Sequence, residues 1–152
     1  MIGGAGAEVE VDTETGRVRI IRLVNVADCG KPINPATCQS QVSGAAIMQL
    51  GFTMQENMEL DGGQVTNASL ADYKIPGIGD VPPMVNEAID AFQHNAPFGA
   101  KGVGESSTMP LSPAIANAID DAVGVRLTEL PLTAEAVFRA LREKDGRPLA
   151  AE

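Results

Sequence analysis

Residues 7–26 read AEVEVDTETGRVRIIRLVNV and predict a β-hairpin. Apolar and charged residues alternate over 7–12 and again over 18–26, as they do in strands with one buried face. The connection between the two runs contains Gly16, and two such runs joined by a short glycine-containing connection form a hairpin. Residues 3–6 before it, GGAG, are expected to be a flexible lead-in. The first strand begins close to residue 1 with no earlier segment to cover it, which suggests a piece of a larger chain.

A long helix is predicted over residues 35–56. Asn34 offers a side-chain oxygen to the free N–H groups of the first turn, and Pro35 has the backbone φ angle that the first helical position needs. Apolar cover is expected on several sides of this helix, from Val42, Ala45, Ala46, Leu50 and Phe52.

One face of that helix combines an amide side chain with two glycines. Gln41, Gly44, Met48 and Gly51 follow one another at helical spacings, so they lie on one side. A glycine inside a helix costs about 1 kcal/mol relative to alanine, so something must approach this face closely. Tight packing of another helix would explain it, and the spacing alone does not decide.

The segment 65–97 is expected to be an ordered, irregular loop, because four prolines and two further glycines prevent a long helix there. A strand is expected within it, around residues 85–92.

Two helices are predicted after this loop. Ser112-Pro113 repeats the pattern of a capping residue followed by proline, and that helix should end at Gly124. Thr133 is expected to cap the last helix, which continues to Lys144. The tail 146–152 is expected to be loose. We therefore predict the α+β class, with residues 1–152 forming one unit.

The composition excludes several classes of function. The 152 residues include 11 Lys and Arg against 20 Asp and Glu, giving a net charge of −9, and no basic cluster is present to bind nucleic acid. Apolar runs are only a few residues long, whereas a membrane helix needs about 20, so no membrane association is expected. One His, one Tyr and no Trp argue against multi-histidine zinc sites and base-stacking surfaces. Cys29 and Cys38 fit neither a disulfide framework nor a metal motif, so we expect a reducing, cytoplasmic location.

Residues 99–107, GAKGVGESS, carry the candidate chemistry. Alternating glycines let backbone N–H groups come within hydrogen-bond distance of a ligand, and Glu105 places one carboxylate at the end of this glycine ribbon. A solvated loop carboxylate is the plainer interpretation of the composition. The setting favours a general base, because a Glu among Gly, Ala and Val is expected to lose water on folding, and a desolvated carboxylate holds its proton more readily.

Five separated motifs resemble the molybdenum hydroxylases, the xanthine dehydrogenase and aldehyde oxidase family. They occur in the family's order and cover nearly the whole chain. The segments that carry the resemblance are 4–12 GAGAEVEVD, 28–51 DCGKPINPATCQSQVSGAAIMQLG, 73–82 YKIPGIGDVP, 100–107 AKGVGESS and 131–141 PLTAEAVFRAL. Ser40 and Ser43 depart from the family pattern, but neither removes a group that the mechanism needs.

The resemblance implies roles for six residues around a molybdenum-molybdopterin cofactor. Glu105 would be the general base of a hydroxylation that takes its oxygen from water. Gln41 would hydrogen-bond the pterin or the ligands of the metal. The backbone donors that approach the cofactor would come from Lys101, Gly102, Val103 and Gly104. No side chain here is expected to bind the metal itself. Lys101 has a plainer alternative, a surface ion pair worth about 0–1 kcal/mol.

The resemblance also implies that the chain is the C-terminal segment of a molybdopterin-binding large subunit. The cofactor is expected in its cytosine dinucleotide form, with iron–sulfur clusters and FAD only on other domains or subunits. Expected partners are the rest of the molybdopterin-binding region, an iron–sulfur subunit and a FAD subunit, and the expected substrate is an aldehyde or an N-heterocycle. The isolated chain is expected to be inactive. The alternative is a non-catalytic partner-binding or scaffold module that keeps the fold.

Three other residues are expected to be structural. His94, flanked by a proline, is expected on the surface or with its polar atoms satisfied. Tyr73 should pack its ring and hydrogen-bond its hydroxyl, and Cys29 should be a small core residue.

Overall fold

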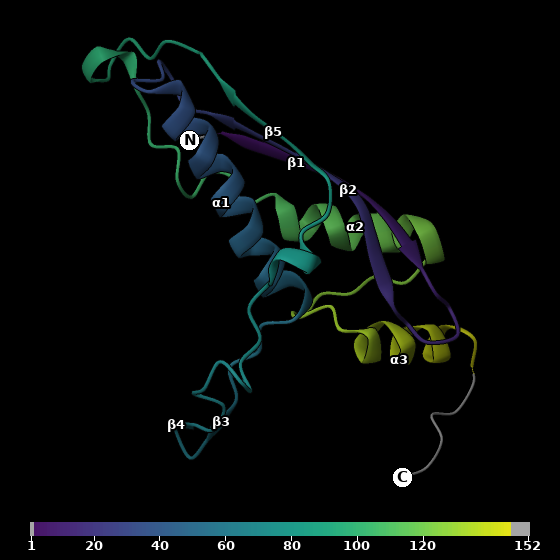
Figure 1. Ribbon diagram of the computed structural model, residues 1–152. Coiled ribbons are helices and arrows are strands. Elements are labelled where there is room, and N and C mark those ends of the chain that lie inside the picture. Colours follow the sequence, from purple (N-terminus) through teal and green to yellow (C-terminus); the bar gives the residue numbers. More distant parts are fainter. Residues whose placement is uncertain (1, 147–152) are drawn as a thin grey trace.

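One three-stranded sheet organises the chain. The computed structural model describes residues 2–146, so the predicted loose tail lies, apart from Gly146, outside the described residues. β1 (Gly3–Val11), β2 (Val18–Asp28) and β5 (Met84–Ile89) form the sheet in the order β1-β2-β5. β1 and β2 are antiparallel, and β5 runs parallel to β2 (Figure 1).

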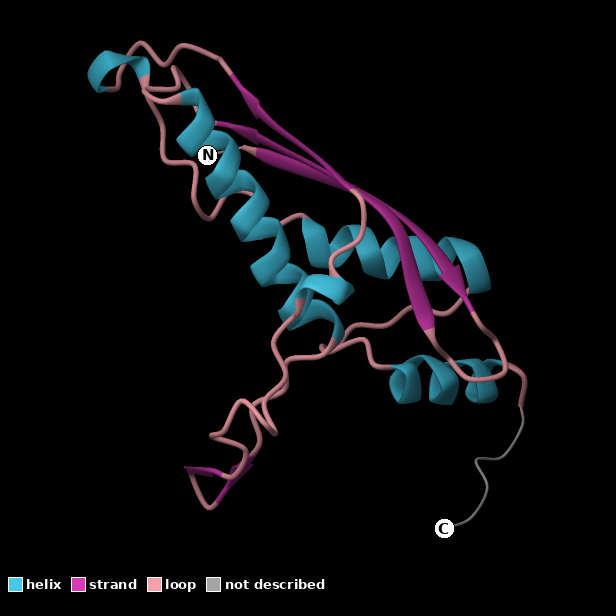
Figure 2. Cartoon of the chain, viewed as in Figure 1, coloured by secondary structure: helices cyan, strands magenta, loops and turns pink. Residues whose placement is uncertain are grey.

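Two helices cover one face of this sheet, and a third lies beyond the hairpin turn (Figure 2). α1 (Pro35–Met54) packs on β5 and β2, and α2 (Leu111–Val123) packs on β1. α3 (Ala134–Lys144) closes the core near the β1–β2 turn. The fully or largely buried residues of this core are Leu23, Ala46, Leu50, Leu111, Ile115, Ile119, Val125, Leu132, Val137 and Leu141. The α+β prediction is therefore confirmed.

The remaining elements are short and lie in the connections. β3 (Leu60–Asp61) and β4 (Gln64–Val65) form a separate two-stranded ribbon that projects from the C-terminal end of α1 (Figure 1). The 3₁₀ turns η1 (Ile78–Asp80) and η2 (Pro97–Gly99) punctuate the loops on either side of β5. The irregular segment expected over 65–97, with a strand inside it, is confirmed.

The predicted hairpin is confirmed, but the flexible lead-in is wrong. Gly3 pairs with Ala27 and Gly6 with Val24, so residues 3–6 extend β1 rather than precede it. A Cβ atom on Gly3 would collide with the carbonyl oxygen of Ser106, so this glycine allows a distant loop to pack against the strand. Nor is the first strand uncovered, because α2 packs on it.

The predicted start of α1 is confirmed, and its cover is partly wrong. Asn34 Oδ1 accepts a hydrogen bond from the Thr37 N–H at 3.2 Å, and Pro35 occupies the first helical position. Val42, Ala45, Ala46 and Leu50 are buried as expected. Phe52 is instead 43% exposed, because it falls on the same side of the helix as Gln41 and Met48.

The predicted start of α2 is wrong by two residues. α2 begins at Leu111, and Ser112 caps nothing, because its hydroxyl is engaged by α1 instead. Ser112 Oγ accepts from Gln49 Nε2 at 2.5 Å and lies 2.6 Å from Thr53 Oγ1. The predicted end at Gly124, with φ of 67°, and the Thr133 cap on α3 are both confirmed.

No helix within residues 2–146 combines the length and the apolar character needed to cross a bilayer.

Candidate functional site

The glycine ribbon, residues 99–107, is attached to the end of β2. Gly30 and Ala100 form an isolated antiparallel bridge, and the Lys101 N–H donates to the Cys29 carbonyl at 2.9 Å. The Lys31 N–H donates to the Gly99 carbonyl at 2.7 Å. Gly30 and Gly99 both have positive φ angles, which a side chain would strain, so the glycines allow the two segments to meet. The ribbon therefore begins at a fixed point of the sheet.

An ion pair strengthens this attachment. Lys101 Nζ lies 2.5 Å from Asp28 Oδ2, and the two side chains are only 20% and 13% exposed. The other carboxylate oxygen of Asp28 accepts the Gly30 N–H at 2.9 Å. The hydrogen bond from Lys101 and then that from Gly30 lower the pKa of Asp28 below its ordinary value. The plainer alternative for the Lys101 side chain, an ion pair with an acidic neighbour, is confirmed, although the pair is more buried than a surface pair.

Gln41 faces the other end of the ribbon. A Cβ atom built on Gly104 would lie 3.7 Å from Gln41 Oε1, so the amide from α1 and the ribbon from the β5–α2 connection meet. Gln41 is exposed, and its amide has no hydrogen-bond partner among residues 2–146. Gly44, on the same side of α1, has no atom within 4 Å of where its Cβ would be. This side of α1 therefore presents a free amide beside open space.

One of the four predicted backbone donors is already used, because the Lys101 N–H donates to the Cys29 carbonyl. Between Gly102 and Ser107 no backbone N–H donates a hydrogen bond within the described part of the chain. Ser106 and Ser107 are fully buried; Ser106 Oγ donates to the Val103 carbonyl at 3.0 Å, whereas Ser107 Oγ has no partner among the described residues. Backbone donors left free in a glycine-rich loop suit a ligand rich in oxygen and nitrogen acceptors. A pterin cofactor is such a ligand, so the donor set fits it.

Glu105 lies in the middle of this donor set, but its setting differs from the prediction. Its carbonyl accepts hydrogen bonds from the Thr108 N–H and hydroxyl at 3.2 and 2.8 Å, which fixes the backbone. Its side chain is exposed, so the prediction that folding removes this carboxylate from water is wrong for this chain. The neighbours Ser106 and Ser107 point into the core instead, because Ser106 packs against Gly3.

The structure brings all six predicted site residues to one edge of the molecule, where β2 ends and α1 begins. The sequence analysis assigned no role to Asp28. Its position two residues before Gly30, together with the single lysine of the ribbon, Lys101, could have indicated the ion pair that attaches the ribbon to β2. It also missed Asn25, whose side chain is fully buried in β2 with both amide atoms unpaired among residues 2–146. No group of three or more potential metal-ligating side chains occurs in the described residues.

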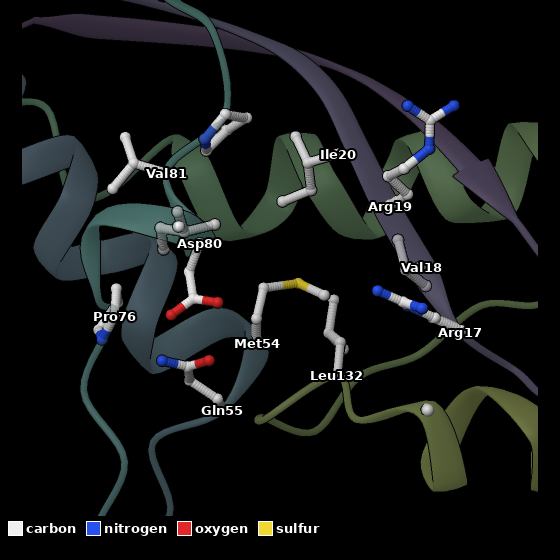
Figure 3. Close-up of a pocket in the computed structure, with 14 residues that line it drawn as sticks. Arg17, Val18, Arg19, Ile20, Met54, Gln55, Pro76, Asp80, Val81 and Leu132 are labelled. Atoms are coloured by element: carbon white, nitrogen blue, oxygen red, sulfur yellow. The ribbon is translucent and has the colours of Figure 1, made fainter.

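A separate cavity lies at the opposite end of α1. It has a volume of about 350 Å³ and is lined by the start of β2, the last turn of α1 and the loop around η1. Met54 and Leu132 form its apolar floor, with Arg17 on one side and Asp80 and Gln55 on the other (Figure 3). None of the predicted site residues lines it. The candidate site is therefore the open edge at the ribbon.

The predicted structural residues behave as expected. Cys29 is 1% exposed, and Tyr73 Oη donates to Glu56 Oε2 at 2.6 Å.

Comparisons with known proteins agree on one family. Residues 1–82 match the family described as "Molybdopterin cofactor-binding domain". The chain is 37% identical over 142 residues to a probable xanthine dehydrogenase subunit of Bacillus subtilis, covering 93% of this chain and 19% of that protein. It is 39% identical to the "6-hydroxypseudooxynicotine dehydrogenase complex subunit gamma" of Paenarthrobacter nicotinovorans, covering 86% of this chain and 17% of that one.

Solved structures give the same result. Quinoline 2-oxidoreductase from Pseudomonas putida 86 matches with a TM-score of 0.81 and 33% identity, over 92% of this chain and 18% of that chain. Aldehyde oxidoreductase from Desulfovibrio gigas matches with a TM-score of 0.79 and 32% identity, over 90% of this chain and 15% of that one. The chain thus spans less than a fifth of the length of these relatives.

Proposed function

This chain belongs to the molybdopterin cofactor-binding domain family of molybdenum oxidoreductases, and from that membership we propose that it forms one wall of a molybdenum hydroxylase active site. Its fold matches a part of the large molybdenum-binding subunits. The proposal extends this to the reaction: hydroxylation of an aldehyde or of a carbon in an N-heterocycle, with water as the source of oxygen.

One observation carries the proposal. The free amide of Gln41, the unpaired N–H groups of residues 102–104 and the carboxylate of Glu105 lie together at one edge, while the Lys101 side chain turns away to Asp28. When bound, the molybdenum-pterin cofactor supplies the redox step and activates a water-derived oxygen. Gln41 and the ribbon would hold the cofactor by hydrogen bonds.

Glu105 would act as the general base. A carboxylate side chain can accept a proton from a reacting oxygen that lies within hydrogen-bond reach. The backbone of Glu105 is fixed by Thr108, which would limit how far the carboxylate can move. Because the side chain is exposed in this chain alone, the water-excluding walls would have to come from the rest of the subunit. The isolated chain is therefore expected to have no turnover.

Further features of the proposal rest on the family alone. We expect the cytosine dinucleotide form of the cofactor, and iron–sulfur and FAD groups on other domains or subunits that receive the electrons. The setting would be cytoplasmic. The partners would be the remaining molybdopterin-binding region and the subunits that carry those groups.

Substitution of Glu105 by Gln tests the base directly. Glu105→Gln in the assembled enzyme is expected to lower turnover by about 10²–10⁴-fold, the usual contribution of a general base, without loss of molybdenum. Glu129→Gln makes the same change at another exposed carboxylate and should leave turnover unchanged. Full turnover in Glu105→Gln would instead favour the alternative, a scaffold module whose ribbon only packs.

A further inference from the structure

The first turns of α1 carry Gln41 but contain no buried residue. Within residues 35–41 every residue is exposed except Cys38, which is partly buried, and the first buried residue of the helix is Val42. Apolar packing fixes the rotation of a helix about its axis where side chains enter the core, and none does so before Val42. Polar contacts must therefore orient this end of α1. The structure shows such contacts with β5, on which α1 packs (Figure 1).

Three residues form a closed ring of hydrogen bonds between α1 and β5. Gln39 Nε2 donates to the Asn86 carbonyl, and Asn86 Nδ2 donates to Ser43 Oγ at 3.2 Å. Ser43 Oγ in turn donates to the Gln39 carbonyl at 3.0 Å. Gln39 and Ser43 are one helical turn apart, so the ring attaches one whole turn of α1 to the strand.

The attached turn has Gln41 at its centre. Gln41 is two residues from both Gln39 and Ser43, and two residues correspond to about 200° of rotation around a helix, so it lies on the opposite side. Holding Gln39 and Ser43 against β5 therefore directs Gln41 away from the strand. On that side Gln41 Oε1 lies 3.7 Å from where a Cβ atom on Gly104 would be, which places the amide beside the glycine ribbon.

Asn86 is an unfavourable residue for the sheet itself. Asparagine is disfavoured in strands, and Asn86 Oδ1 is buried without a hydrogen-bond partner among residues 2–146. Its register partner on β2 is Asn25, which is fully buried with both amide atoms unpaired in the same part of the chain. Buried polar atoms without a partner lower the free energy of unfolding. The side chain of Asn86 is thus explained by its bond to Ser43 and not by the stability of the sheet.

We propose that Asn86 is a positioning residue. Through Gln39 and Ser43 it holds the first turns of α1 in the rotation that directs Gln41 toward the glycine ribbon. The consequence for the cofactor rests on the proposed function, whereas the attachment of α1 to β5 does not.

Hydrogen exchange in the assembled enzyme, measured by mass spectrometry, tests the attachment. Ser43→Ala removes the hydroxyl of the ring. Ser40→Ala is the matched control, because Ser40 Oγ also donates to the carbonyl of the preceding turn, that of Ala36 at 3.0 Å, but bonds to no strand within the described residues. Both variants gain the same helix propensity, so their difference isolates the link to β5. We expect exchange over residues 38–43 to be about fivefold faster in Ser43→Ala than in Ser40→Ala, as loss of one hydrogen bond predicts.

Asn86→Leu removes the same bond from the strand side while keeping a side chain of similar size. It should speed exchange over residues 38–43 as Ser43→Ala does, and leave exchange in α2 unchanged or slower, because a buried unpaired amide is lost. Ser43→Thr keeps a hydroxyl at this position and should restore the slow exchange of the wild type. A variant that merely damaged the fold would speed exchange in α2 as well.

A double-mutant cycle tests whether Asn86 acts through Gln41. Gln41→Ala should lower the molybdenum content of the assembled enzyme, and Asn86→Leu should lower it by no more than that. In the Gln41→Ala background, Asn86→Leu should cause no further loss, because the amide that it orients is already absent. A general structural defect would instead add its own loss to that of Gln41→Ala.

Two results would overturn the proposal. One is equal exchange over residues 38–43 in Ser43→Ala and Ser40→Ala, which would show that the ring does not hold the helix. The other is an additive loss of molybdenum in the double variant. A wild-type molybdenum content in Gln41→Ala would count against the proposed function, and the exchange measurement would still decide whether Asn86 holds α1, so the two can fail separately.

Discussion

Asp28 is the residue that holds the glycine ribbon to the sheet. Its carboxylate accepts from Lys101 Nζ and from the Gly30 N–H, and these bonds lower its pKa below the ordinary 3.8. A carboxyl group with a lowered pKa in the folded state stabilises the fold above its unfolded pKa, and this contribution is lost as the pH falls through the folded pKa. The contribution of Asp28 to the free energy of unfolding should therefore be lost below pH 3.8.

Asp28→Asn should remove this pH-dependent contribution. We expect the difference in unfolding free energy between wild type and variant to be constant above about pH 5 and to shrink in more acidic solution. Urea unfolding of both proteins, measured from neutral to acidic pH, gives this difference in unfolding free energy. Glu135→Gln breaks an exposed helical ion pair with Arg139 as a control and should cost about 0.3–0.5 kcal/mol at most. A wild type–Asp28→Asn difference that does not change with pH would show that the ion pair does not anchor the ribbon.

At the scale of elements, the two glycines on the candidate-site side of α1 have different surroundings. A Cβ atom on Gly51 would overlap Glu56 Oε1 and lie 2.7 Å from Pro76 Cδ, and Glu56 is itself held by Tyr73. A Cβ atom on Gly44 would meet nothing within 4 Å. Gly51 is thus needed for packing within this chain, because a loop, and not another helix, lies against it. Gly44 has open space beside it and can contact a group from outside this chain.

The two Gly→Ala variants should therefore change stability in opposite directions. Gly44→Ala is expected to raise the unfolding free energy of the chain by about 1 kcal/mol through helix propensity. Gly51→Ala is expected to lower it by about 1–3 kcal/mol, because overlap outweighs propensity. Chemical denaturation of the purified variants measures both. If Gly44 allows close approach of the cofactor, Gly44→Ala should also lower the molybdenum content of the assembled enzyme, and an unchanged content would contradict that role.

Local patterns predicted the elements well, and contacts between distant segments account for the errors. The period-two alternation identified the hairpin, and Asn34 and Thr133 identified two helix starts, because each signal lies within a few residues. Residues 3–6 were misassigned because their glycines hide the strand pattern and their strand partners, residues 24–27, lie beyond the hairpin turn. Ser112 failed as a cap because Gln49 and Thr53 on α1 compete for its hydroxyl.

The site residues came from the motif resemblance, and their surroundings could not be predicted. The sequence placed Glu105 among small apolar residues, which favours burial, yet the backbone turns Ser106 and Ser107 inward and leaves Glu105 outside. Burial of a loop side chain depends on which distant element covers it, and no element within residues 2–146 covers Glu105.

At the scale of the whole molecule, apolar side chains are exposed on the same side of α1 as Gln41. Met48 is 47% and Phe52 is 43% exposed, next to the open space at Gly44. Together with free backbone donors and a free amide, this surface is suited to contact with more protein and a cofactor. The chain spans only 19% and 17% of the length of two relatives that it matches, so in the proposed assembly further protein would contact this surface.

The Phe52→Gln variant tests whether this side of α1 is needed for assembly with other protein and not for folding of the chain. Its effect on the stability of the chain itself should be within about 0.5 kcal/mol, as for exposed positions, whereas recovery of the assembled complex should fall. Leu50→Ala changes the neighbouring buried side, is 3% exposed, and should lower stability by about 2–5 kcal/mol. Denaturation of the chain and the yield of co-purified partner measure the two effects. Normal assembly of Phe52→Gln would show that this side of α1 is not an interface.

The most direct measurement is to tag this chain in its source cells, purify what assembles with it, and determine molybdenum and pterin in that complex. We predict stoichiometric molybdenum and pterin, recovered with further molybdopterin-binding protein. A folded chain recovered alone and free of molybdenum would contradict the assignment of this chain as one wall of a molybdenum hydroxylase active site.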